Sequence, residues 1–490
     1  MLVMPLSIGL FTAILKQSGY HVALFDTAHY LTDETTSPAN RVKFLQARAF
    51  DYGRDLRVRW KTDLFGDFRR TVESFAPDLL VVTSVEDTWV QAVALLRCVD
   101  DLRIPSICGG VFVTAAPEKA IAFPPVRMIG VGDGEEIVAQ VAERVRQGES
   151  CEGIPGVWVK REDGHTQKTP RGPVVDINTL PVPDFSLFEE ARFYRPMGGK
   201  VHRTIPLETY RGCPYACSFC NSPMQWQLSR EQEVGNFLRR KPIPLLRKKI
   251  IQLIDRYHPD LFYIVDDSFL ARPETEIEAL AAMYAEFRIP FWMNTRPETI
   301  TPKTLGWLRD MHCYRMSLGL EAGNETYRDR VLHRKMRNDK LREHFSYAAE
   351  GGVTFSINNI IGYPDETRGL VFETIALNRQ LRGFDSLTVS IFTPYHGTEL
   401  RRVAEQKGYL DSSVITTHTT SRSLLDMPAP YLSRDEIDQA MRTFPLYVHL
   451  DQSRWPEIAQ AETDDTIFVQ LQDEFRQLIW GADPDRGGIP

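Results

Sequence analysis

Three cysteines stand close together near the middle of the chain and are the residues best suited to chemistry. Cys213, Cys217 and Cys220 lie in Arg211–Pro223 (RGCPYACSFCNSP) with the spacing C-x3-C-x2-C. Thiolates bind iron–sulfur clusters, and this spacing on one loop lets three of them reach a single cluster. Three ligands leave one iron of a [4Fe-4S] cluster without a protein thiolate, which is the open position that a catalytic metal site needs. The segment therefore predicts a catalytic [4Fe-4S] cluster bound by these three residues.

A structural zinc site is the alternative for the same cysteines. It needs a fourth Cys or His nearby, and His202 and His258 are present but poorly spaced. The remaining cysteines are scattered, and the total of seven is odd, so no disulfide framework is recognisable. Clustered cysteines without such a framework indicate metal or redox chemistry. The scattered ones are Cys98, Cys108, Cys151 and Cys313.

The bulk composition excludes several classes of function. The 490 residues carry 58 Lys and Arg against 65 Asp and Glu, a net charge of -7, so no nucleic-acid partner is predicted. The basic runs Arg239–Lys241 and Arg247–Lys249 are interpreted as a solvated helix face rather than a binding patch. No apolar stretch is long enough to span a membrane, and no signal peptide is recognised. We therefore expect a cytoplasmic protein of about three domains that has no membrane partner.

The elements that position the cysteines begin with an α/β domain over residues 1–150. Buried-strand patterns alternate with helical patterns there, which predicts parallel βαβ units in a doubly wound, Rossmann-like sheet. Only Met1–Met4 precede the first helix, so the opening strand usual in such domains is expected to be missing. The expected strands are His21–Asp26, Asp78–Ser84, Pro105–Val113 and Val126–Val131, and the expected helices include Ser7–Ser18 and Trp89–Asp100.

The remainder divides into three parts. Residues 151–200 are rich in Gly, Pro and charge and are expected to be a linker with a small hairpin near Gly156–Lys160. Residues 201–400 alternate strand and helix again, which predicts a partial parallel β/α barrel with its active residues at the carboxyl ends of the strands. Residues 401–490 form a C-terminal, mostly helical region with helices at Ser433–Thr443 and Thr466–Trp480 and a frayed end near Asp483–Pro490. The barrel strands are expected at Pro206–Arg211, Leu261–Val265, Phe291–Thr295, Tyr314–Leu320, Phe355–Ile361 and Leu387–Phe392, with helices at Leu245–Tyr257, Glu274–Phe287, Pro302–Met311, Asn338–Glu350 and Gly369–Leu381.

The cysteine motif resembles that of the radical S-adenosylmethionine (SAM) superfamily. The resemblance implies that the open iron chelates SAM, and that one electron cleaves SAM to methionine and a deoxyadenosyl radical, which abstracts hydrogen. It also implies that Phe219, the aromatic residue before the last cysteine, packs on the adenine. An electron donor such as flavodoxin or ferredoxin is implied as a partner.

Three further segments resemble the SAM-binding segments of that family. Asp266 and Asp267 replace a Gly-Gly-Glu segment that holds the SAM amino group, with a pair of helix-capping acids as the equally weighted alternative. Glu321, in Ser317–Gly323 (SLGLEAG), corresponds to the ribose contact. Ile361 and Gly362, in IIGYP, correspond to the adenine-contacting segment.

A doubly wound domain ahead of such a barrel resembles the cobalamin-binding radical SAM enzymes, the class B methyltransferase-like group. Ligands bind beyond the carboxyl ends of strands in such sheets, and Ser84, Gly109, Gly110 and Gly132 follow strands. They are the expected cobalamin contacts, although a tight turn alone also explains the glycine pair. The Asp-x-His-x-x-Gly motif that supplies histidine to cobalt is absent around His29, so histidine ligation of cobalt is not expected.

The resemblance implies a methyltransferase that acts on an unactivated carbon or phosphorus of a small-molecule substrate. One SAM would methylate cobalamin, and a second would supply the radical that activates the substrate. An oxidative cyclisation or rearrangement with the same cofactors is the main alternative. A cobalamin- or SAM-responsive sensor without turnover is a third hypothesis, which the intact cysteine motif disfavours.

Overall fold

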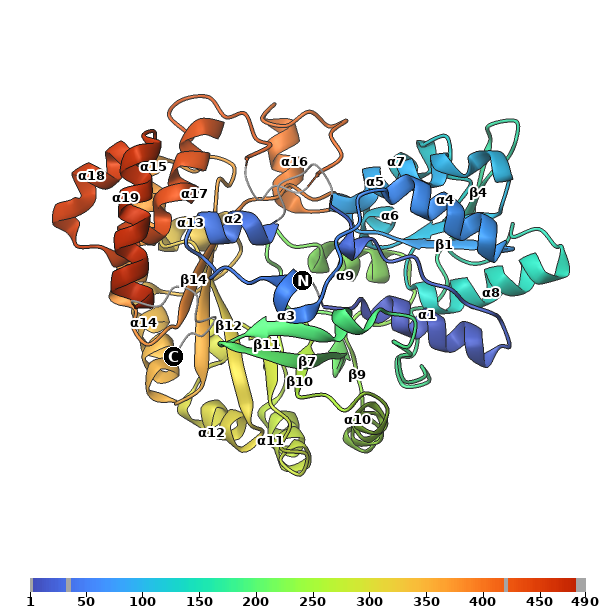
Figure 1. Cartoon of the computed structure of the whole chain (residues 1–490), viewed down its shortest axis with the longest axis horizontal. Helices are drawn as coiled ribbons and strands as arrows, with labels where there is room; N and C mark the ends of the chain where they lie inside the picture. Colours follow the sequence, from blue (N-terminus) through green and yellow to red (C-terminus); the bar gives the residue numbers. More distant parts are fainter. Residues whose placement is uncertain (1–2, 32–36, 418–421, 482–490) are drawn as a thin grey trace.

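The computed structural model describes residues 3–31, 37–417 and 422–481, and it contains two large β-sheets surrounded by helices (Figure 1). The first sheet has the order β1-β2-β3-β4-β5. β1 (Leu80–Thr83), β2 (Ser106–Gly109) and β3 (Met128–Gly130) are parallel. β4 (Val157–Lys160) and β5 (Thr166–Lys168) add an antiparallel hairpin. The predicted hairpin is therefore present, and it extends the first sheet beyond residue 150.

Helices cover both faces of the first sheet. Ile107 of β2 packs against α8 (Gly134–Gln147) on one face, and α1 (Leu6–Gln17) lies beside α8. The next residue, Cys108, packs against α5 (Glu86–Cys98) on the opposite face. Successive residues of a strand point to opposite sides of a sheet, so both faces of β2 are buried under helices. The expected doubly wound, Rossmann-like arrangement is confirmed.

Two strand predictions in this part need correction. His21–Asp26 forms no strand, because no described strand lies beside it and an extended segment needs a hydrogen-bonded neighbour. The chain instead enters a short 3-10 turn at Thr27–His29, and its one bridge there joins Tyr30 to Lys61. Pro105–Val113 was predicted too long, because β2 ends at Gly109 and α6 (Val111–Ala115) begins two residues later.

The second sheet has seven strands in the order β14-β13-β12-β11-β10-β7-β6. All neighbours are parallel except β6 and β7. β6 and β14 are its two edges, so it is a curled half-barrel rather than a closed one, as predicted. Its strands are β6 (Tyr194–Met197), β7 (Lys200–Leu207), β10 (Leu261–Ile264), β11 (Phe291–Thr295), β12 (Cys313–Glu321), β13 (Thr354–Ile361) and β14 (Ser386–Ile391).

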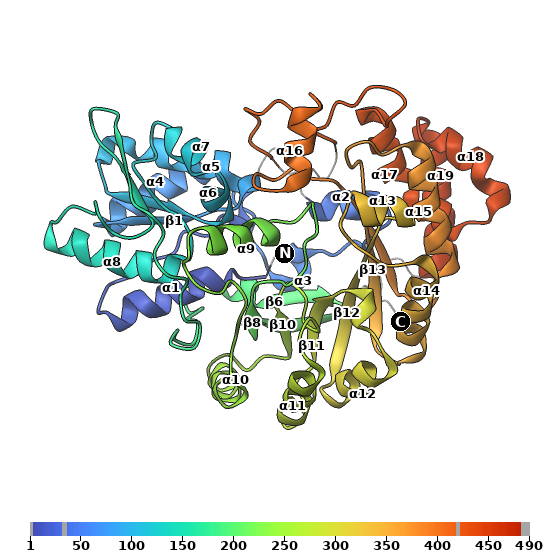
Figure 2. The ribbon, with the colours of Figure 1, turned by 180° about the vertical axis from the view of Figure 1, so that it is seen from behind.

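Helices pack along the outer face of the half-barrel (Figure 2). The outward side chains of its strands, such as Phe262, Met293 and Ile357, are fully buried against them. All five helices predicted for this region are present to within a few residues. They are α10 (Ile243–Tyr257), α11 (Glu274–Tyr284), α12 (Pro302–Asp310), α14 (Asn338–Glu350) and α15 (Arg368–Gln380), with the short α13 (Glu325–Arg330) after β12.

One barrel strand differs from its prediction. The strand predicted at Pro206–Arg211 is wrong in its second half, because β7 ends at Leu207. The chain then turns, and β8 (Tyr210–Arg211) pairs antiparallel with β9 (Arg239–Arg240). The cysteine loop follows β8 directly, and α9 (Ser222–Glu231) follows the loop and lies between the two sheets in both views (Figures 1 and 2).

The inner face of the half-barrel is less completely packed than the outer face. Tyr263, Trp292, Asn294, Asn358 and Thr388 are half-buried, whereas their neighbours along each strand are buried. Hydrogen bonds tie several of these polar groups together, such as Trp292 Nε1 to Ser317 Oγ at 2.8 Å. This alternation leaves a polar and aromatic inner surface within reach of solvent or a ligand.

N-terminal residues cross the open side of the half-barrel. α2 (Ser37–Lys43) and α3 (Tyr52–Leu56) lie in front of the second sheet (Figure 1). The Val389 N–H of the edge strand β14 donates to Gln46 Oε1 at 3.0 Å. Part of the unpaired edge is thereby satisfied by a side chain of the N-terminal segment.

The C-terminal region is helical, as predicted. α17 (Arg434–His449) packs against α15 and β14 and places Ile437 against Gly362. The predicted frayed end near Asp483–Pro490 lies outside the described residues, and no described helix is long and apolar enough to cross a membrane. The remaining helices are α4 (Leu64–Phe75), α7 (Pro117–Ala122), α16 (Glu399–Gln406), α18 (Trp455–Ala461) and α19 (Asp465–Phe475), and the last ends in a π-turn at Arg476–Trp480.

Gly110→Ala is expected to destabilise the protein by about 3 kcal/mol. Gly110 has φ +126°, and a methyl group there would lie 2.1 Å from the Ser84 carbonyl oxygen. Gly109→Ala is the matched control, because its nearest contact would be an ordinary 3.9 Å from the Gly130 carbonyl oxygen. Thermal unfolding of both variants measures the difference in stability. An equal decrease in stability for Gly110→Ala and Gly109→Ala would contradict the prediction.

Candidate cofactor site

The cysteine loop lies at the carboxyl ends of the half-barrel strands. Asp266, just after β10, binds the residues that lead into the loop, and Arg296, just after β11, places Nη1 3.6 Å from Cys217 Sγ. Cys217 is buried, and Cys213 and Cys220 are half-buried. Burial, together with the negative charges of Asp267, Cys220 and Cys217, raises the pKa of Cys213 to about 12. The three thiols therefore lie within electrostatic reach of one another.

The donor set fits a cluster better than a single ion. Within residues 3–31, 37–417 and 422–481, no three or more His, Cys, Asp or Glu side chains surround one metal position. Structural zinc needs four ligands that converge on one point. The two candidate histidines lie at the other end of the strands, with His202 near the start of β7 and His258 at the end of α10, ahead of β10. A [4Fe-4S] cluster is wider and is bound by thiolates on its corners. Its positive irons would also offset the burial that raises the pKa of Cys213 and Cys220.

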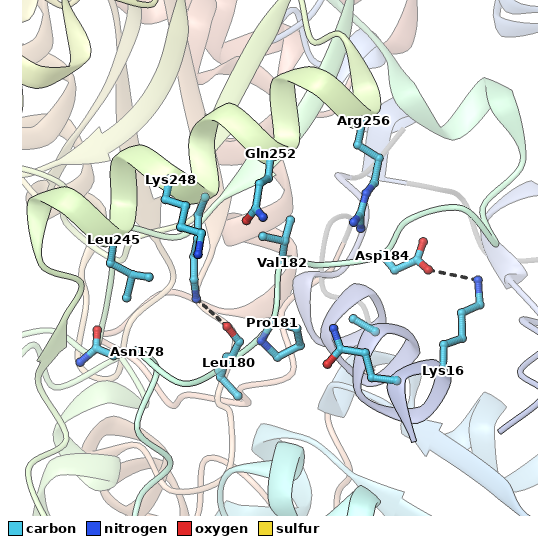
Figure 3. A pocket seen from close by; sticks show the side chains of 13 residues that line it. Lys16, Asn178, Leu180, Pro181, Val182, Asp184, Leu245, Lys248, Gln252 and Arg256 are labelled. Carbon is cyan, nitrogen blue, oxygen red and sulfur yellow. Dashed lines mark hydrogen bonds and ion pairs between the residues drawn. The ribbon is translucent and has the colours of Figure 1, made fainter. Parts of the chain in front are cut away.

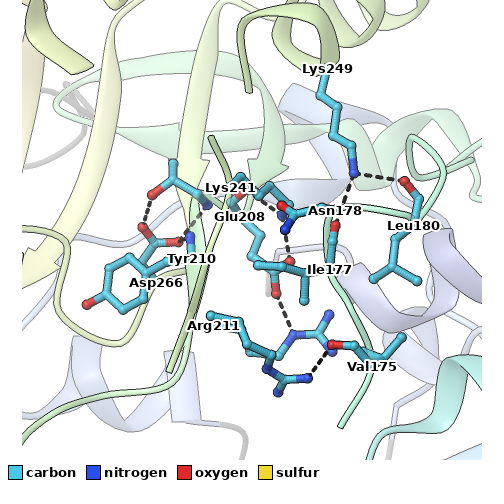
Figure 4. Close-up of polar contacts among 12 residues, drawn as sticks. Val175, Ile177, Asn178, Leu180, Glu208, Tyr210, Arg211, Lys241, Lys249 and Asp266 are labelled. Carbon is cyan, nitrogen blue, oxygen red and sulfur yellow. Dashed lines mark hydrogen bonds and ion pairs between the residues drawn. The ribbon is translucent and has the colours of Figure 1, made fainter. Parts of the chain in front are cut away.

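A buried carboxylate fixes the start of the loop (Figure 4). Glu208 Oε2 lies 2.6 Å from Lys241 Nζ, and its Oε1 accepts from Arg211 Nε at 2.9 Å. Burial raises the pKa of Glu208, but the charges of Lys241 and Arg211 outweigh it and hold the pKa at about 2. Glu208 is therefore ionised, and it orients Arg211 two residues before Cys213.

Arg211 also connects the loop to the Rossmann-like sheet. Its Nη2 lies 2.8 Å from Glu135 Oε1, and its Nη1 lies 3.4 Å from Asp133 Oδ1. Arg239 Nη1 binds the other Asp133 oxygen at 2.6 Å. Both acids follow β3 directly, so the carboxyl ends of the two sheets meet at this cluster of charges. Gly132 was predicted here as a cobalamin contact, whereas no role was predicted for the neighbouring acids Asp133 and Glu135.

The paired aspartates after β10 have different surroundings. Asp266 is buried, and its carboxylate accepts from Thr209 N at 2.8 Å and from Arg272 Nη2 at 3.0 Å. Burial raises its pKa to about 6, although Arg272 lowers it. Asp267 is exposed, accepts from Ser222 Oγ at 3.1 Å and lies near Cys213 and Cys220. Neither caps a helix, since α11 begins at Glu274, so the helix-capping alternative is wrong.

The other predicted SAM residues gather around Tyr363. The Phe219 ring lies 5.8 Å from the Tyr363 ring. Ile361 is fully buried at the end of β13, and Gly362 has φ +78°, with its N–H donating to Glu366 Oε2 at 2.5 Å. Glu321 ends β12 with φ +69°, and its carboxylate lies 3.4 Å from Arg334 Nη1. Burial raises the pKa of Glu321 despite that arginine.

The four predicted cobalamin residues lie at the carboxyl ends of β1, β2 and β3. Ser84 Oγ donates to the Val85 carbonyl at 2.9 Å, so its hydroxyl hydrogen already has a partner. The backbone of Gly110 approaches Ser84 so closely that a side chain would not fit, which supports a role for this glycine in local packing. Gly109 is open, and Gly132 lies under the Arg171 guanidinium, where an added Cβ would be 2.8 Å from Nε.

A second buried charge cluster joins the two sheets. The Glu86 carboxylate lies 2.6 Å from His396 Nδ1 and accepts from the Thr416 N–H at 2.9 Å. Burial raises the pKa of Glu86, but these hydrogen bonds bring it below its ordinary value. His396, to which the sequence assigned no role, thus fixes the segment after β14 against the first turn of α5.

A separate groove of about 400 Å³ lies between α1, the linker and α10 (Figure 3). None of the predicted cofactor residues lines it. Lys16 pairs with Asp184 at 3.1 Å, and Lys249 is buried and donates to the Leu180 carbonyl at 2.8 Å. The prediction of a solvated basic face is therefore wrong for Lys249, which holds the linker on α10, whereas Lys248 is exposed. It is also wrong for Arg239 and Lys241, which pair with Asp133 and Glu208.

Glu208→Gln is expected to lower the free energy of unfolding by about 3 kcal/mol at pH 7, because two buried cations lose their counter-charge. The folded-state pKa of about 2 is below the ordinary value of 4.5, so the contribution is present above pH 4.5 and is lost as the pH falls towards 2. Urea unfolding at pH 7 and pH 3 measures it, with exposed Glu162→Gln as control. An equal decrease in the free energy of unfolding at pH 7 and pH 3 would contradict the conclusion that Glu208 is ionised and paired.

Comparison with known proteins agrees with this geometry. Residues 207–377 match the model of the Radical SAM superfamily. An uncharacterized methyltransferase of Pyrococcus horikoshii is 22% identical over 77% of this chain and 80% of its own. Cytidylyl-2-hydroxyethylphosphonate methyltransferase of Streptomyces wedmorensis is 20% identical over 83% and 79%. Anaerobic magnesium-protoporphyrin IX monomethyl ester cyclase of Rubrivivax gelatinosus is 24% identical over 68% and 59%.

Solved structures share the fold of almost the whole chain. The radical SAM methyltransferase TsrM of Kitasatospora setae, solved with cobalamin and a [4Fe-4S] cluster, aligns with a TM-score of 0.60 at 13% identity and covers 97% of both chains. The cobalamin-dependent radical SAM enzyme OxsB, solved with aqua-cobalamin and SAM, has a TM-score of 0.63 at 14% identity over 99% of this chain and 71% of its own. Residues 207–377 thus match the Radical SAM superfamily, and the chain as a whole shares the fold of TsrM and OxsB.

Proposed function

We propose that the protein is a cobalamin-dependent radical SAM methyltransferase that acts on an unactivated carbon or phosphorus of a small molecule. One observation carries the proposal: the loop with the three cysteines lies where the carboxyl ends of two different sheets meet. Ligands of both kinds of α/β sheet bind at those ends. The curated methyltransferases that resemble most of this chain support the same reaction class.

Cys213, Cys217 and Cys220 would hold the cluster, and Asp267 is the better candidate for the SAM ammonium group. It is exposed beside the cysteines, whereas the oxygens of Asp266 are already occupied by Thr209 and Arg272. Phe219 with Ile361 and Gly362 would form the adenine site, because an aromatic ring and a glycine backbone suit a flat base. Glu321 would contact the ribose, at the cost of its long contact with Arg334.

Cobalamin would lie between the first sheet and the cysteine loop. Gly109 and Gly132 present backbone rather than side chains there, which suits the close approach of a large planar ring or its nucleotide tail. Arg171 beside Gly132 has Nε and Nη1 buried without a partner, so this corner offers donors for an anionic group. When bound, the cluster would supply the electron that cleaves SAM, and cobalamin would carry the methyl group to the substrate.

The chain's own contribution is position and the exclusion of water. The clusters around Arg211 and Glu86 hold the two sheets together on either side of the proposed site. α2 and α3 lie in front of the second sheet and α17 packs at its β14 edge, so a radical formed inside would meet few water molecules. The half-buried inner face of the second sheet is then the surface left for a substrate.

An oxidative cyclase with the same cofactors is the second candidate, because a cyclase is among the curated relatives. We further infer an electron donor such as flavodoxin or ferredoxin, since the cluster must be reduced. A reducing, cytoplasmic setting belongs to the proposal because all seven cysteines are free. We also propose boundaries near residues 150, 200 and 400, with the segment 151–200 adding β4 and β5 to the first sheet and β6 to the second.

The reaction is tested with SAM deuterated in its methyl group. Reconstituted protein with cobalamin, a reductant and candidate substrates should form deoxyadenosine and pass the deuterated methyl to a product, as measured by mass spectrometry. The Cys213→Ala, Cys217→Ala, Cys220→Ala variant should form neither. Deoxyadenosine with an unlabelled product would favour the cyclase, and no deoxyadenosine under any condition would refute the enzyme proposal.

Asp267→Asn and Asp266→Asn are expected to fail in different ways. Loss of the Asp267 charge should weaken SAM binding about tenfold or more without changing the thermal midpoint, because its hydrogen bond with Ser222 can persist. Asp266→Asn should lower the thermal midpoint, since it leaves Arg272 without its buried counter-charge. Equilibrium dialysis with SAM and thermal unfolding separate the two, and weaker SAM binding in Asp266→Asn alone would reverse the roles.

A further inference from the structure

Arg195 of β6 lies over the inner face of the half-barrel. Its guanidinium carbon is 4.6 Å from the centre of the Trp292 ring and 5.1 Å from the centre of the Tyr263 ring. Both rings are half-buried and belong to the neighbouring strands β11 and β10. The arginine reaches them from the edge strand, so its charge is held inside the half-barrel rather than on its surface.

No described carboxylate pairs with Arg195. Burial lowers the pKa of its guanidinium, Tyr263 and Tyr52 oppose that effect, and the positive charge of Arg41 lowers the pKa further. Arg41 belongs to α2 and Tyr52 to α3, the two helices that cover the open side. Arg195 therefore places a positive charge, which has no described carboxylate partner, beside the phenol of Tyr263 and the indole of Trp292 on the inner face. The aromatic faces stabilise the Arg195 cation by a modest amount.

Other arginines of the half-barrel are paired differently. Arg315 makes two hydrogen bonds to Asp385, Arg272 binds Asp266, and Arg334 contacts Glu321. A buried charge is costly unless it is paired, so these arginines have carboxylates beside them. Arg195 has no such carboxylate among the described residues, and it lies on the half-buried inner surface of the half-barrel. An oxyanion supplied from solution would complete its surroundings.

We propose that Arg195 binds an oxyanionic group of the substrate, a carboxylate or a phosphonate, whose adjoining carbon skeleton lies against Trp292 and Tyr263. The word substrate here rests on the proposed function. A planar guanidinium can bind either group through two parallel hydrogen bonds. Arg41 adds charge, and the amides of Asn294 and Asn358 on the same inner face supply hydrogen bonds to neutral parts. The substrate class is therefore an organic acid or phosphonate with an apolar or aromatic body.

The test is calorimetric titration of the full-length protein with benzoate, phenylphosphonate and the neutral benzyl alcohol. It is done on reconstituted protein with saturating SAM and no reductant, and again on protein without its cofactors. Arg195→Gln should weaken binding of the preferred anion about tenfold or more, and Arg195→Lys should restore part of it. Arg382→Gln, an exposed arginine of the same half-barrel, should bind like the unaltered protein. Tighter binding of benzoate would indicate a carboxylate substrate, and tighter binding of phenylphosphonate would indicate a phosphonate.

Several outcomes would overturn the proposal. These are no anion binding to the unaltered protein, equal binding in Arg195→Gln, or equal binding of benzyl alcohol. Displacement of the anion by SAM would also overturn it, because Arg195 would then serve the SAM carboxylate. The cluster spectrum of Arg195→Gln should match that of the unaltered protein, which excludes misfolding. Failure to form a cluster would refute the proposed function instead, and the cofactor-free titration would still decide on Arg195.

Discussion

The arrangement depends on two buried carboxylates that fix the entry to the cysteine loop. Glu208 binds Lys241 and Arg211, and Asp266 binds the Thr209 backbone and Arg272. Buried ion pairs contribute little to net stability, because desolvation cancels most of the attraction, but breaking one is costly. Such pairs therefore select one geometry. Here that geometry is the path of residues 208–213, which sets where the first cysteine stands.

The same constraint extends to the first sheet. Arg211 is shared between Glu208 and the acids Asp133 and Glu135 that follow β3, so a displacement of either sheet would break a buried contact. Glu86 and His396 fix a second junction between the sheets. Two such junctions bring the carboxyl ends of a Rossmann-like sheet and a half-barrel to one region. A reaction that transfers a group between two cofactors requires both to be held at such a shared site.

Local patterns in the sequence predicted the elements well, and contacts between distant residues account for the errors. Phe291–Thr295 and Asn338–Glu350 were predicted with the bounds that they have, because buried residues recur at every second position in the strand and every three to four positions in the helix. His21–Asp26 has a strand pattern but no described neighbour to pair with. Asp266 and Asp267 look equivalent in sequence, and only the fold separates the buried anchor from the exposed acid. Arg195 was missed because β6 was taken as part of a linker.

The central claim is that Cys213, Cys217 and Cys220 hold a four-iron cluster with one open corner. Mössbauer spectroscopy of protein reconstituted with isotopically enriched iron tests it most directly, with the triple cysteine-to-alanine variant as control. The account predicts a cubane cluster in which one iron changes its signal when SAM is added, and no cluster in the variant. A single metal ion bound by the same cysteines, or a cluster whose irons all ignore SAM, would contradict it.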